Sequence, residues 1–481
     1  MNLPDTAAKP ASHIPEEDAG KPCPRDFSAV EAGIIPERGR RKRRKFSTFA
    51  QPAPDVEVLP EYEFVLQAMR EGCPAIFVTG KAGTGKSTLI QWLRGKLDSC
   101  AVVAPTAIAA ITAQGETIHS FFGLPPRLID PSESHPATAR VRLVLENIRY
   151  LVVDEVSMVP PNIVDTMSHI LQSARRSDLP FGGVPVVLVG DLLQLPPVVA
   201  SQEESVYFSH RYKTRYFFSA DVFKQQPIVP VNLTRVRRQA DEEFIGALHR
   251  IRLGQEHRDA VALFNRRCWR DRPANAPAGI YLAPTNQAAR TINSRELDSL
   301  PGDARLYEAA VSGDVPVEKW KLPVPDRLEL KAGARVIFLQ NRKPDWINGD
   351  LGEVAGLEAD HIRVRKAGTG NVVVVGKATW RKYKYVYDYE TKRIEQEVVG
   401  AFEQFPLALG WAVTIHKSQG LTLDALTLDL GRGAFAEGQT YVALSRARTL
   451  EGITLARPIS MRDVRTDPVV VAFYRSLGVD R

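Results

Sequence analysis

The chain has 481 residues, more than one hydrophobic core usually supports, so the sequence predicts several folded units. Its 44% hydrophobic and 25% charged residues are typical of globular proteins, and no apolar run reaches the roughly 18 residues that a membrane span needs. The four scattered cysteines, without a C-x-x-C pair, argue against zinc ribbons, iron–sulfur clusters and disulfide frameworks and favour a reducing environment. A net charge of +7 is compatible with a polyanionic partner without requiring one.

Residues 1–55 are rich in proline, poor in branched apolar residues and without amphipathic periodicity, which predicts a disordered tail. Within it, the stretch RGRRKRRK (38–45) has seven basic residues in eight positions. That density would attract phosphates if exposed, so the stretch is an auxiliary DNA tether, an import-like patch or an ordinary solvated segment. The first residues carry acidic side chains and no apolar core, which argues against a secretory signal or a transit peptide.

After the tail, helical and strand patterns alternate. An amphipathic helix is predicted over LPEYEFVLQAMREG (59–72). Continuous apolar runs follow at AIFVTG (75–80), AVVAP (101–105), YLVVDE (150–155) and VPVVLVGD (184–191). Such runs are typical of strands buried on both faces of a parallel sheet. The sequence therefore predicts an α/β domain over residues 56–230.

A phosphate-binding loop is predicted where GKAGTGKS follows the run AIFVTG and opens a helix. Its glycines permit positive φ angles, which turn successive N–H groups toward a phosphate. Lys86 is predicted to reach the β- and γ-phosphates of ATP, and Ser87 to ligate Mg²⁺. The predicted nucleotide-binding set is Gly80, Ala82, Gly83, Thr84, Gly85, Lys86, Ser87 and Thr88.

Polar residues follow two further predicted strands, at the edge where open α/β sheets bind ligands. The run YLVVDE ends in Asp154, expected to hold Mg²⁺, and Glu155, expected to orient and deprotonate the attacking water. The segment VGDLLQLPP places Asp191 and Gln194 beside them, where the Gln194 amide is a candidate sensor of the γ-phosphate. These features predict ATP and Mg²⁺ as cofactors but do not separate a kinase-like enzyme, a switch and a motor.

A second series of strand patterns begins at GIYLAPTN (279–286) and resumes at ALTLDL (425–430). Between them the pattern changes to alternation with clustered turns and aromatics, which is typical of a small antiparallel β insert. The chain is thus divided into the tail at 1–55, the first α/β domain at 56–230, the second α/β domain in two parts at 231–349 and 401–481, and the insert at 350–400.

Seven segments occur in one order: GKAGTGKST (80–88), APTAIAAITAQGETIHSFF (104–122), VVDEVSM (152–158), VGDLLQLPP (189–197), LTRVRRQ (233–239), AVTIHKSQGLTLD (412–424) and TYVALSRAR (440–448). This series resembles the RecD and petite-integration-frequency helicases of the 5′→3′ branch of helicase superfamily one, and most closely their bacterial members. The similarity covers about residues 59–460. It implies two RecA-like domains with ATP in the cleft between them, single-stranded DNA across their top, and an SH3-like fold for the insert.

The resemblance also implies residues that the ATP motifs do not supply. Arg238 and Arg446 match the family's arginines that reach across the cleft to the γ-phosphate. Gln419 and Gly420 match positions that couple DNA contact to the nucleotide state, and they join the nucleotide-binding set. The predicted catalytic set is Lys86, Asp154, Glu155, Gln194, Arg238 and Arg446.

The DNA contacts that the resemblance implies come from both domains. The implied set is Thr106, Phe121, Thr285, His416, Lys417 and Ser418. For Phe121 and Phe122, base stacking or a wedge is the alternative to a place in the core, and one of the pair is expected in the core. Trp380, beside RKYKYVY, either lines a nucleic-acid groove or fills the core of a small β-barrel.

Two positions depart from the family pattern. Many relatives have an adenine-reading glutamine ahead of the phosphate loop, but Glu63 and Gln67 stand in no clear register with it, so this function is unassigned. Gly410 stands where alanine is expected, and we interpret it as a loosened helix start.

The expected function is an ATP-dependent DNA helicase that moves 5′→3′ as a monomer on single-stranded and forked DNA. The alternatives are a DNA-stimulated translocase that displaces proteins without unwinding, activity on RNA–DNA hybrids or structured DNA, and a nucleotide-dependent recruiting module. The hydrolytic residues Glu155, Arg238 and Arg446 argue against the last. A bacterial, nucleoid-associated cytoplasmic location is expected, and the basic stretch leaves a nuclear one open.

Overall fold

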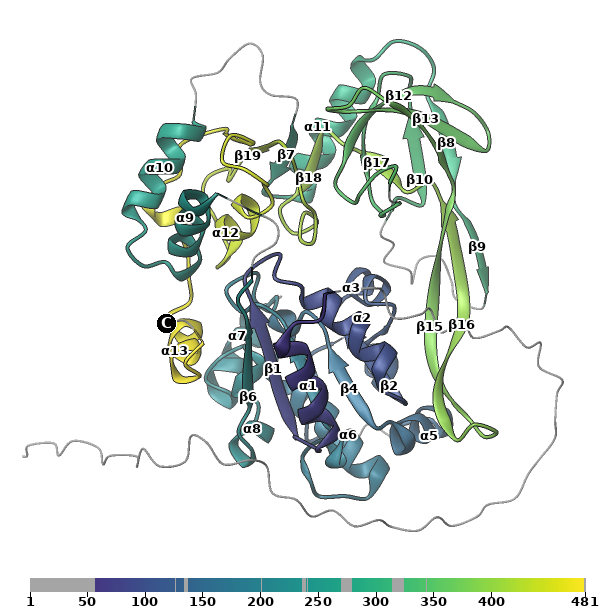
Figure 1. The fold of residues 1–481 in the computed structure, drawn as a ribbon, viewed down its shortest axis with the longest axis vertical. Helices are drawn as coiled ribbons and strands as arrows, with labels where there is room; N and C mark the ends of the chain where they lie inside the picture. Colours follow the sequence, from purple (N-terminus) through teal and green to yellow (C-terminus); the bar gives the residue numbers. More distant parts are fainter. Residues whose placement is uncertain are drawn as a thin grey trace, which may run out of the picture.

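The computed structural model describes residues 57–479 except 126, 134–136, 200, 236–238, 240, 270–278, 314–323 and 343. Figure 1 shows two α/β units, one above the other in this view, with a β-rich unit beside the upper one. The tail predicted for 1–55 and the catalytic candidate Arg238 lie outside the described residues. Within the described part of the chain, no helix is both long and apolar enough to cross a lipid bilayer.

The first α/β domain is built on a parallel sheet. Its strands are β1 (Ala75–Gly80), β2 (Cys100–Ala104), β3 (Glu116–Thr117), β4 (Tyr150–Val153), β5 (Val186–Val189) and β6 (Val229–Leu233). Its helices are α1 (Pro60–Arg70), α2 (Lys86–Lys96), α3 (Ala107–Thr112), α4 (Ile118–Phe122), α5 (Ala139–Asn147), α6 (Pro161–Arg175), α7 (Gln202–Arg211) and α8 (Val222–Gln225). The strand order is β3-β2-β4-β5-β1-β6.

Helices cover both faces of this sheet, which explains the continuous apolar runs in its strands. Every residue of β1 and β5 is buried. Val152 and Val187 pack with α1 and α2 on one face, whereas Leu151 and Leu188 pack with α5 and α6 on the other. Neighbouring residues of a strand point to opposite faces, so a sheet covered on both sides needs apolar side chains at every position.

The second α/β domain has a smaller parallel sheet. Its strands are β7 (Ile280–Ala283), β18 (Ala412–Thr414), β19 (Leu426–Leu428) and β20 (Ile453–Leu455), in the order β18-β7-β19-β20. Its helices are α9 (Glu242–Leu253), α10 (Arg258–Cys268), α11 (Asn286–Ser299) and α12 (Gln439–Leu444). The two α/β units and the β-rich unit agree with the fold class expected from the sequence.

The β insert is a small antiparallel sheet. Its strands are β11 (Arg335–Phe338), β12 (Leu351–Leu357), β13 (His361–Lys366), β14 (Val372–Gly376) and β17 (Leu407–Leu409), in the order β14-β13-β12-β11-β17, and the pair β8 (Arg305–Glu308) and β10 (Arg327–Leu330) lies beside it. These strands extend on both sides of the 350–400 range predicted for the insert. The shortest of these strands have too few residues to show a clear alternation of apolar and polar side chains in the sequence.

Gly410, interpreted from the sequence as a loosened helix start, lies instead between the strands β17 and β18. A Cβ atom added there would lie 2.6 Å from the carbonyl carbon of Val336. The helix-start interpretation is therefore wrong. The β11 backbone approaches this position so closely that the Cβ atom of an alanine would clash with it, which explains the glycine.

A long hairpin of β15 (Ala378–Asp388) and β16 (Arg393–Gln404) leaves the insert and reaches the first domain, as Figure 1 shows at the right; β9 (Ala310–Gly313) pairs with β16. We call β15 and β16 the arm. Tyr385 and Ile394 of the arm are buried in the core of the first domain. The Val102 backbone N–H donates to Tyr385 Oη at 2.8 Å. The aromatic alternation in RKYKYVY thus builds a contact between domains.

The C-terminal helix α13 (Pro468–Ser476) also crosses between domains. Val470 and Tyr474 pack in the core of the first domain. The hydroxyls of Tyr474 and Thr79 lie 2.7 Å apart, and the Asn232 side chain donates to the Val479 carbonyl at 2.7 Å. The end of the range 401–481, predicted to belong to the second domain, therefore packs against the first.

Candidate active site

The phosphate loop connects β1 to α2 at the edge of the first sheet. Gly83 and Gly85 have φ angles of +80° and +96°, in the left-handed region that glycine adopts without strain. The Tyr62 hydroxyl donates to the Gly85 carbonyl at 2.8 Å, and a Cβ added at Gly85 would lie 2.5 Å from that hydroxyl oxygen. Two constraints therefore require glycine at position 85: its backbone conformation and the close approach of α1.

Lys86 lies folded over this loop. Its Nζ donates to the carbonyls of Gly80 at 2.7 Å and Lys81 at 3.1 Å. Burial lowers the pKa of Lys86, against the carboxylates of Asp191 and Glu155, which act to raise it. Two backbone carbonyls and these carboxylates thus surround the Lys86 ammonium group and favour its charged form. A charged ammonium at this loop is suited to bind a phosphate.

Asp154 and Glu155 follow β4 at the same sheet edge. Asp154 Oδ1 accepts from the Glu155 backbone N–H at 2.8 Å, and Glu155 has a φ of +49°, a left-handed conformation that costs a non-glycine residue about 1–3 kcal/mol. Burial raises the pKa of Asp154 to about 7, and the charge of Glu155 adds to this effect. Burial also raises the pKa of Glu155, against the charges of Lys86 and Arg446. Two carboxyl groups this close hold protons more tightly than isolated ones.

The sensor candidate Gln194 connects the two domains. Its Nε2 donates to Asp191 Oδ2 at 3.2 Å, and its Oε1 accepts from Gln419 Nε2 at 3.2 Å. Gln194 follows β5 in the first domain, whereas Gln419 follows β18 in the second. A movement of either domain across the cleft therefore acts directly on this bond.

Arg252, at the end of α9, is a residue of this site that the sequence analysis did not identify. Its guanidinium lies 3.0 Å from Asp191 Oδ1, with side chains only 2% and 0% exposed. Burial acts to raise the pKa of Asp191, but the charges of Arg252 and Lys86 hold it below its usual range. A signal was present: Phe244, Leu248 and Arg252 recur every four residues, so an arginine occupies the apolar face of α9.

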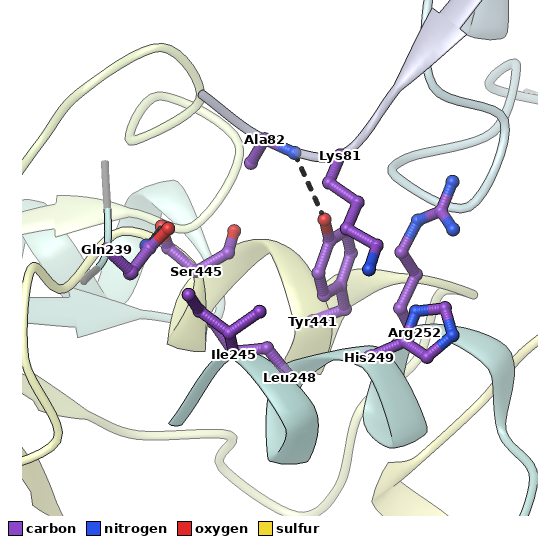
Figure 2. Close-up of a pocket in the computed structure, with 9 residues that line it drawn as sticks. All are labelled: Lys81, Ala82, Gln239, Ile245, Leu248, His249, Arg252, Tyr441 and Ser445. Atoms are coloured by element: carbon purple, nitrogen blue, oxygen red, sulfur yellow. Dashed lines mark hydrogen bonds between the residues drawn. The ribbon is translucent and has the colours of Figure 1, made fainter. Parts of the chain in front are cut away.

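Figure 2 shows the cleft pocket, in which Lys81 and Ala82 of the phosphate loop face the second domain. The Ala82 backbone N–H donates to Tyr441 Oη of α12 at 3.2 Å, and burial raises the pKa of Tyr441 to about 12. The opposite wall is formed by Gln239, Ile245, Leu248, His249, Arg252, Tyr441 and Ser445. The phosphate loop is thus one wall of a pocket between domains.

Arg446, one of the two predicted arginine fingers, is buried just after the end of α12. Its Nε donates to the Val442 carbonyl at 2.9 Å, and its charge acts on Glu155. The second, Arg238, lies outside the described residues. The next residue, Gln239, donates to the carbonyls of Ser445 at 3.1 Å and Ala447 at 2.9 Å, on both sides of Arg446.

Most DNA candidates lie where strands of the two sheets end. The hydroxyls of Thr106 and Thr285 cap α3 and α11, each accepting a backbone N–H at 3.2 Å. Lys417 is exposed, whereas Ser418 is buried and its hydroxyl donates to the Ile415 carbonyl at 2.7 Å. The structure therefore leaves Lys417 as an exposed cation, with Ser418 supporting the turn beneath it.

Phe121 does not present a face to DNA in this structure. It is 4% exposed, and its ring meets Phe122 edge-on at 5.0 Å and Tyr385 of the arm at 5.4 Å. Both phenylalanines are in the core, as was expected for one of the pair, and the arm covers Phe121, so in this structure its ring has no face open to a base. Trp380 is also buried, 5.9 Å from the Phe402 ring, which favours its core interpretation.

The chain was compared with protein families, with known proteins and with solved structures. Residues 62–261 match the family model of PIF1-like helicases. The protein of Bdellovibrio bacteriovorus named ATP-dependent DNA helicase Pif1 is 33% identical over 433 residues, which is 88% of this chain and 93% of that protein. Bacteroides Pif1 in complex with ADP-AlF4 is 36% identical and superposes with a TM-score of 0.82 over 88% of this chain and 98% of that one. Bacteroides Pif1 bound to single-stranded DNA covers 88% and 97% at the same identity, with a TM-score of 0.62.

Proposed function

This chain belongs to the PIF1-like helicase family of ATP-dependent DNA helicases, and from this premise we propose that it moves 5′→3′ on single-stranded DNA and opens the duplex ahead of it. The observation that carries the proposal is the bond between Gln194 and Gln419. Gln194 also contacts Asp191 beside Lys86, while Gln419 follows the exposed Lys417 by two residues. One hydrogen bond thus connects the phosphate side of the cleft to a strand-end turn suited to DNA.

In the proposed cycle, ATP enters between the phosphate loop and α12. Lys86 exchanges its backbone carbonyl partners for the β- and γ-phosphates, and Arg446 approaches the γ-phosphate from the second domain. Glu155 takes the proton of the attacking water. Loss of the γ-phosphate releases Gln194, so the two domains separate and the grip on DNA alternates.

The donor set at the sheet edge fits a magnesium ion. Ser87 is exposed at the start of α2 and supplies a hydroxyl, and Asp154 supplies a carboxylate. Oxygen donors of this kind are the ligands that Mg²⁺ prefers. We propose that these two residues hold Mg²⁺, which when bound would neutralise charge on the phosphate oxygens.

We expect the apparent affinity for Mg²⁺ to fall about tenfold between about pH 8 and about pH 6, because Asp154, with a pKa near 7, must lose its proton to bind a cation. The measurement is the Mg²⁺ concentration that gives half-maximal ATP hydrolysis at saturating ATP. Ser87→Ala should weaken Mg²⁺ at both pH values and keep their ratio, since serine does not titrate in this range. If the unaltered protein needed the same Mg²⁺ concentration for half-maximal hydrolysis at both pH values, the role of Asp154 would be contradicted.

The direction of movement is tested with two forked duplexes that differ only in which strand carries the long single-stranded tail. With ATP and Mg²⁺, we expect separation of the duplex with the 5′ tail and little of the one with the 3′ tail. The reverse preference would overturn the proposed polarity. Hydrolysis stimulated by single-stranded DNA without separation of either fork would favour the translocase alternative, and an RNA strand in the same forks tests activity on hybrids.

We propose the monomer as the active form, because both walls of the cleft come from one chain. The unwinding rate per molecule should then be independent of protein concentration on a fork with one loading tail. A cytoplasmic, nucleoid-associated location remains a prediction from the sequence.

A further inference from the structure

The loop between β19 and α12 presents an exposed aromatic ring at the edge where DNA candidates gather. Phe435 in this loop is 55% exposed. The strands β18, β7 and β19 are parallel neighbours, so the segments after their ends meet at one edge of the sheet. Those segments contain Thr285, His416 and Lys417, in addition to Phe435.

The Phe435 ring stacks on a second ring. Its centroid lies 6.2 Å from that of His416, with only 15° between the ring planes. Burial lowers the pKa of His416, so at neutral pH its imidazole is a neutral ring and a poor partner for phosphate. His416, predicted from the sequence as a DNA contact, is here the support of Phe435.

Backbone hydrogen bonds at Ala434 and Phe435 hold the loop that carries the exposed ring. The Phe435 backbone N–H donates at 3.0 Å to Oε1 of Gln439, a residue that is only 1% exposed. The Ala434 backbone N–H donates at 3.0 Å to Asp463 Oδ1, and Arg457 contacts both oxygens of that carboxylate at 2.8 and 2.9 Å. A single exposed apolar residue needs no explanation by itself, but a preorganised aromatic ring loses little entropy when a flat ligand stacks on it.

Exposed cations accompany the ring. Lys417 follows His416 directly, and Arg432 lies in the same loop as Phe435. The nearby carboxylate of Asp429 accepts from the Tyr281 hydroxyl at 3.0 Å and from the Gly431 backbone N–H at 2.7 Å, so its oxygens already have partners. An aromatic platform with cations at its side is the combination by which proteins hold single-stranded nucleic acid.

We propose that Phe435, supported by His416, stacks one base of single-stranded DNA while Lys417 contacts the adjoining phosphate. This proposal rests on the proposed function and adds a base-stacking position to it. The contact is indifferent to sequence, because every base offers a flat face, and it suits a motor that must step along any strand.

The first test separates stacking from charge. Phe435→Ala should weaken binding to a thymidine oligonucleotide about tenfold, since a stacked base contributes about 1–3 kcal/mol, without changing the slope of log K against log salt. Lys417→Ala should instead lower that slope by about 0.7, the value for one phosphate contact on a single strand. Fluorescence anisotropy across a salt series gives both quantities. A changed slope or unchanged affinity in Phe435→Ala would overturn the stacking role.

The second test detects the stacked base directly. With 2-aminopurine placed at successive positions of an oligonucleotide no longer than one binding site, the unaltered protein should quench one position strongly, Phe435→Trp should keep the quench, and Phe435→Leu should lose it. Tyr389→Ala removes a ring that is 73% exposed at the tip of the arm and should leave affinity and quench unchanged. An equal quench in Phe435→Leu means that another residue stacks the base.

The two proposals fail in different ways. If the unaltered protein binds and unwinds DNA but Phe435→Ala and Phe435→Leu bind equally well, only the stacking inference is wrong. If the unaltered protein neither binds single-stranded DNA nor separates forks, the proposed function itself is wrong. Circular dichroism melts verify that each variant is folded, and Phe435→Trp with its retained quench keeps the inference testable if Phe435→Ala does not fold.

Discussion

Lys86→Ala should reduce DNA-stimulated ATP hydrolysis by about 10³-fold and abolish strand separation, because a preorganised charged donor beside the reacting phosphate is typically worth that much. The ammonium of Lys86 is positioned by the carbonyls of Gly80 and Lys81 and lies within the field of Asp191 and Glu155. Removing it leaves those negative groups facing the γ-phosphate. Hydrolysis is measured with and without single-stranded DNA, and unwinding on a fork with a 5′ tail.

Lys96→Ala is the matched control for this variant. Lys96 is the last residue of the same helix and is exposed, so its loss should leave both activities near those of the unaltered protein. Lys86→Arg should also be strongly impaired, because the larger planar guanidinium does not fit a site built around a compact ammonium. Hydrolysis by Lys86→Ala at the normal rate would show that the cleft described here is not the catalytic one.

Arg252→Gln should lower the free energy of unfolding by about 3–5 kcal/mol, since removing one partner of a buried ion pair leaves the other charge without its direct partner. The remaining charge would be Asp191, which is 0% exposed in its side chain. The pair also has Tyr474 beside it, whose ring lies 5.4 Å from the Arg252 guanidinium. Thermal and denaturant unfolding measure the loss, and because the pair joins two domains, DNA-stimulated hydrolysis should fall with it.

Two further variants make the result specific. The double variant Arg252→Gln/Asp191→Asn replaces both charges with amides and should be more stable than Arg252→Gln alone. Arg250→Gln changes an exposed arginine on the same helix and should alter stability by no more than about 0.5 kcal/mol. A double variant no more stable than Arg252→Gln would show that the loss comes from packing and not from an uncompensated charge.

The nucleotide side of the site follows from local patterns in the sequence. Lys86, Asp154 and Gln194 each lie within a few residues of the end of a strand that is recognisable as an apolar run, and parallel strands bring their carboxyl ends to one edge. Chain order and strand type are therefore enough to predict that these residues gather. Their hydrogen bonds and pKa shifts depend on burial, which a one-dimensional pattern does not contain.

The arm shows where such patterns are insufficient. The aromatic alternation around Tyr385 correctly indicates a β-strand, but the same pattern serves a barrel core, a nucleic-acid groove or a contact with another domain. Only the assembled structure shows Tyr385 against Phe121, a contact that buries the Phe121 ring. Long-range packing of this kind leaves little trace in the spacing of either segment.

The sequence by itself determined the fold class, the family and the loop that binds phosphate, because apolar periodicity and short motifs depend on neighbouring residues. The tertiary structure decided which distant groups meet: Arg252 with Asp191, Gln419 with Gln194, and Phe435 with His416. These contacts join different loops and helices, and their strength comes from burial and mutual orientation, which exist only after the chain has folded.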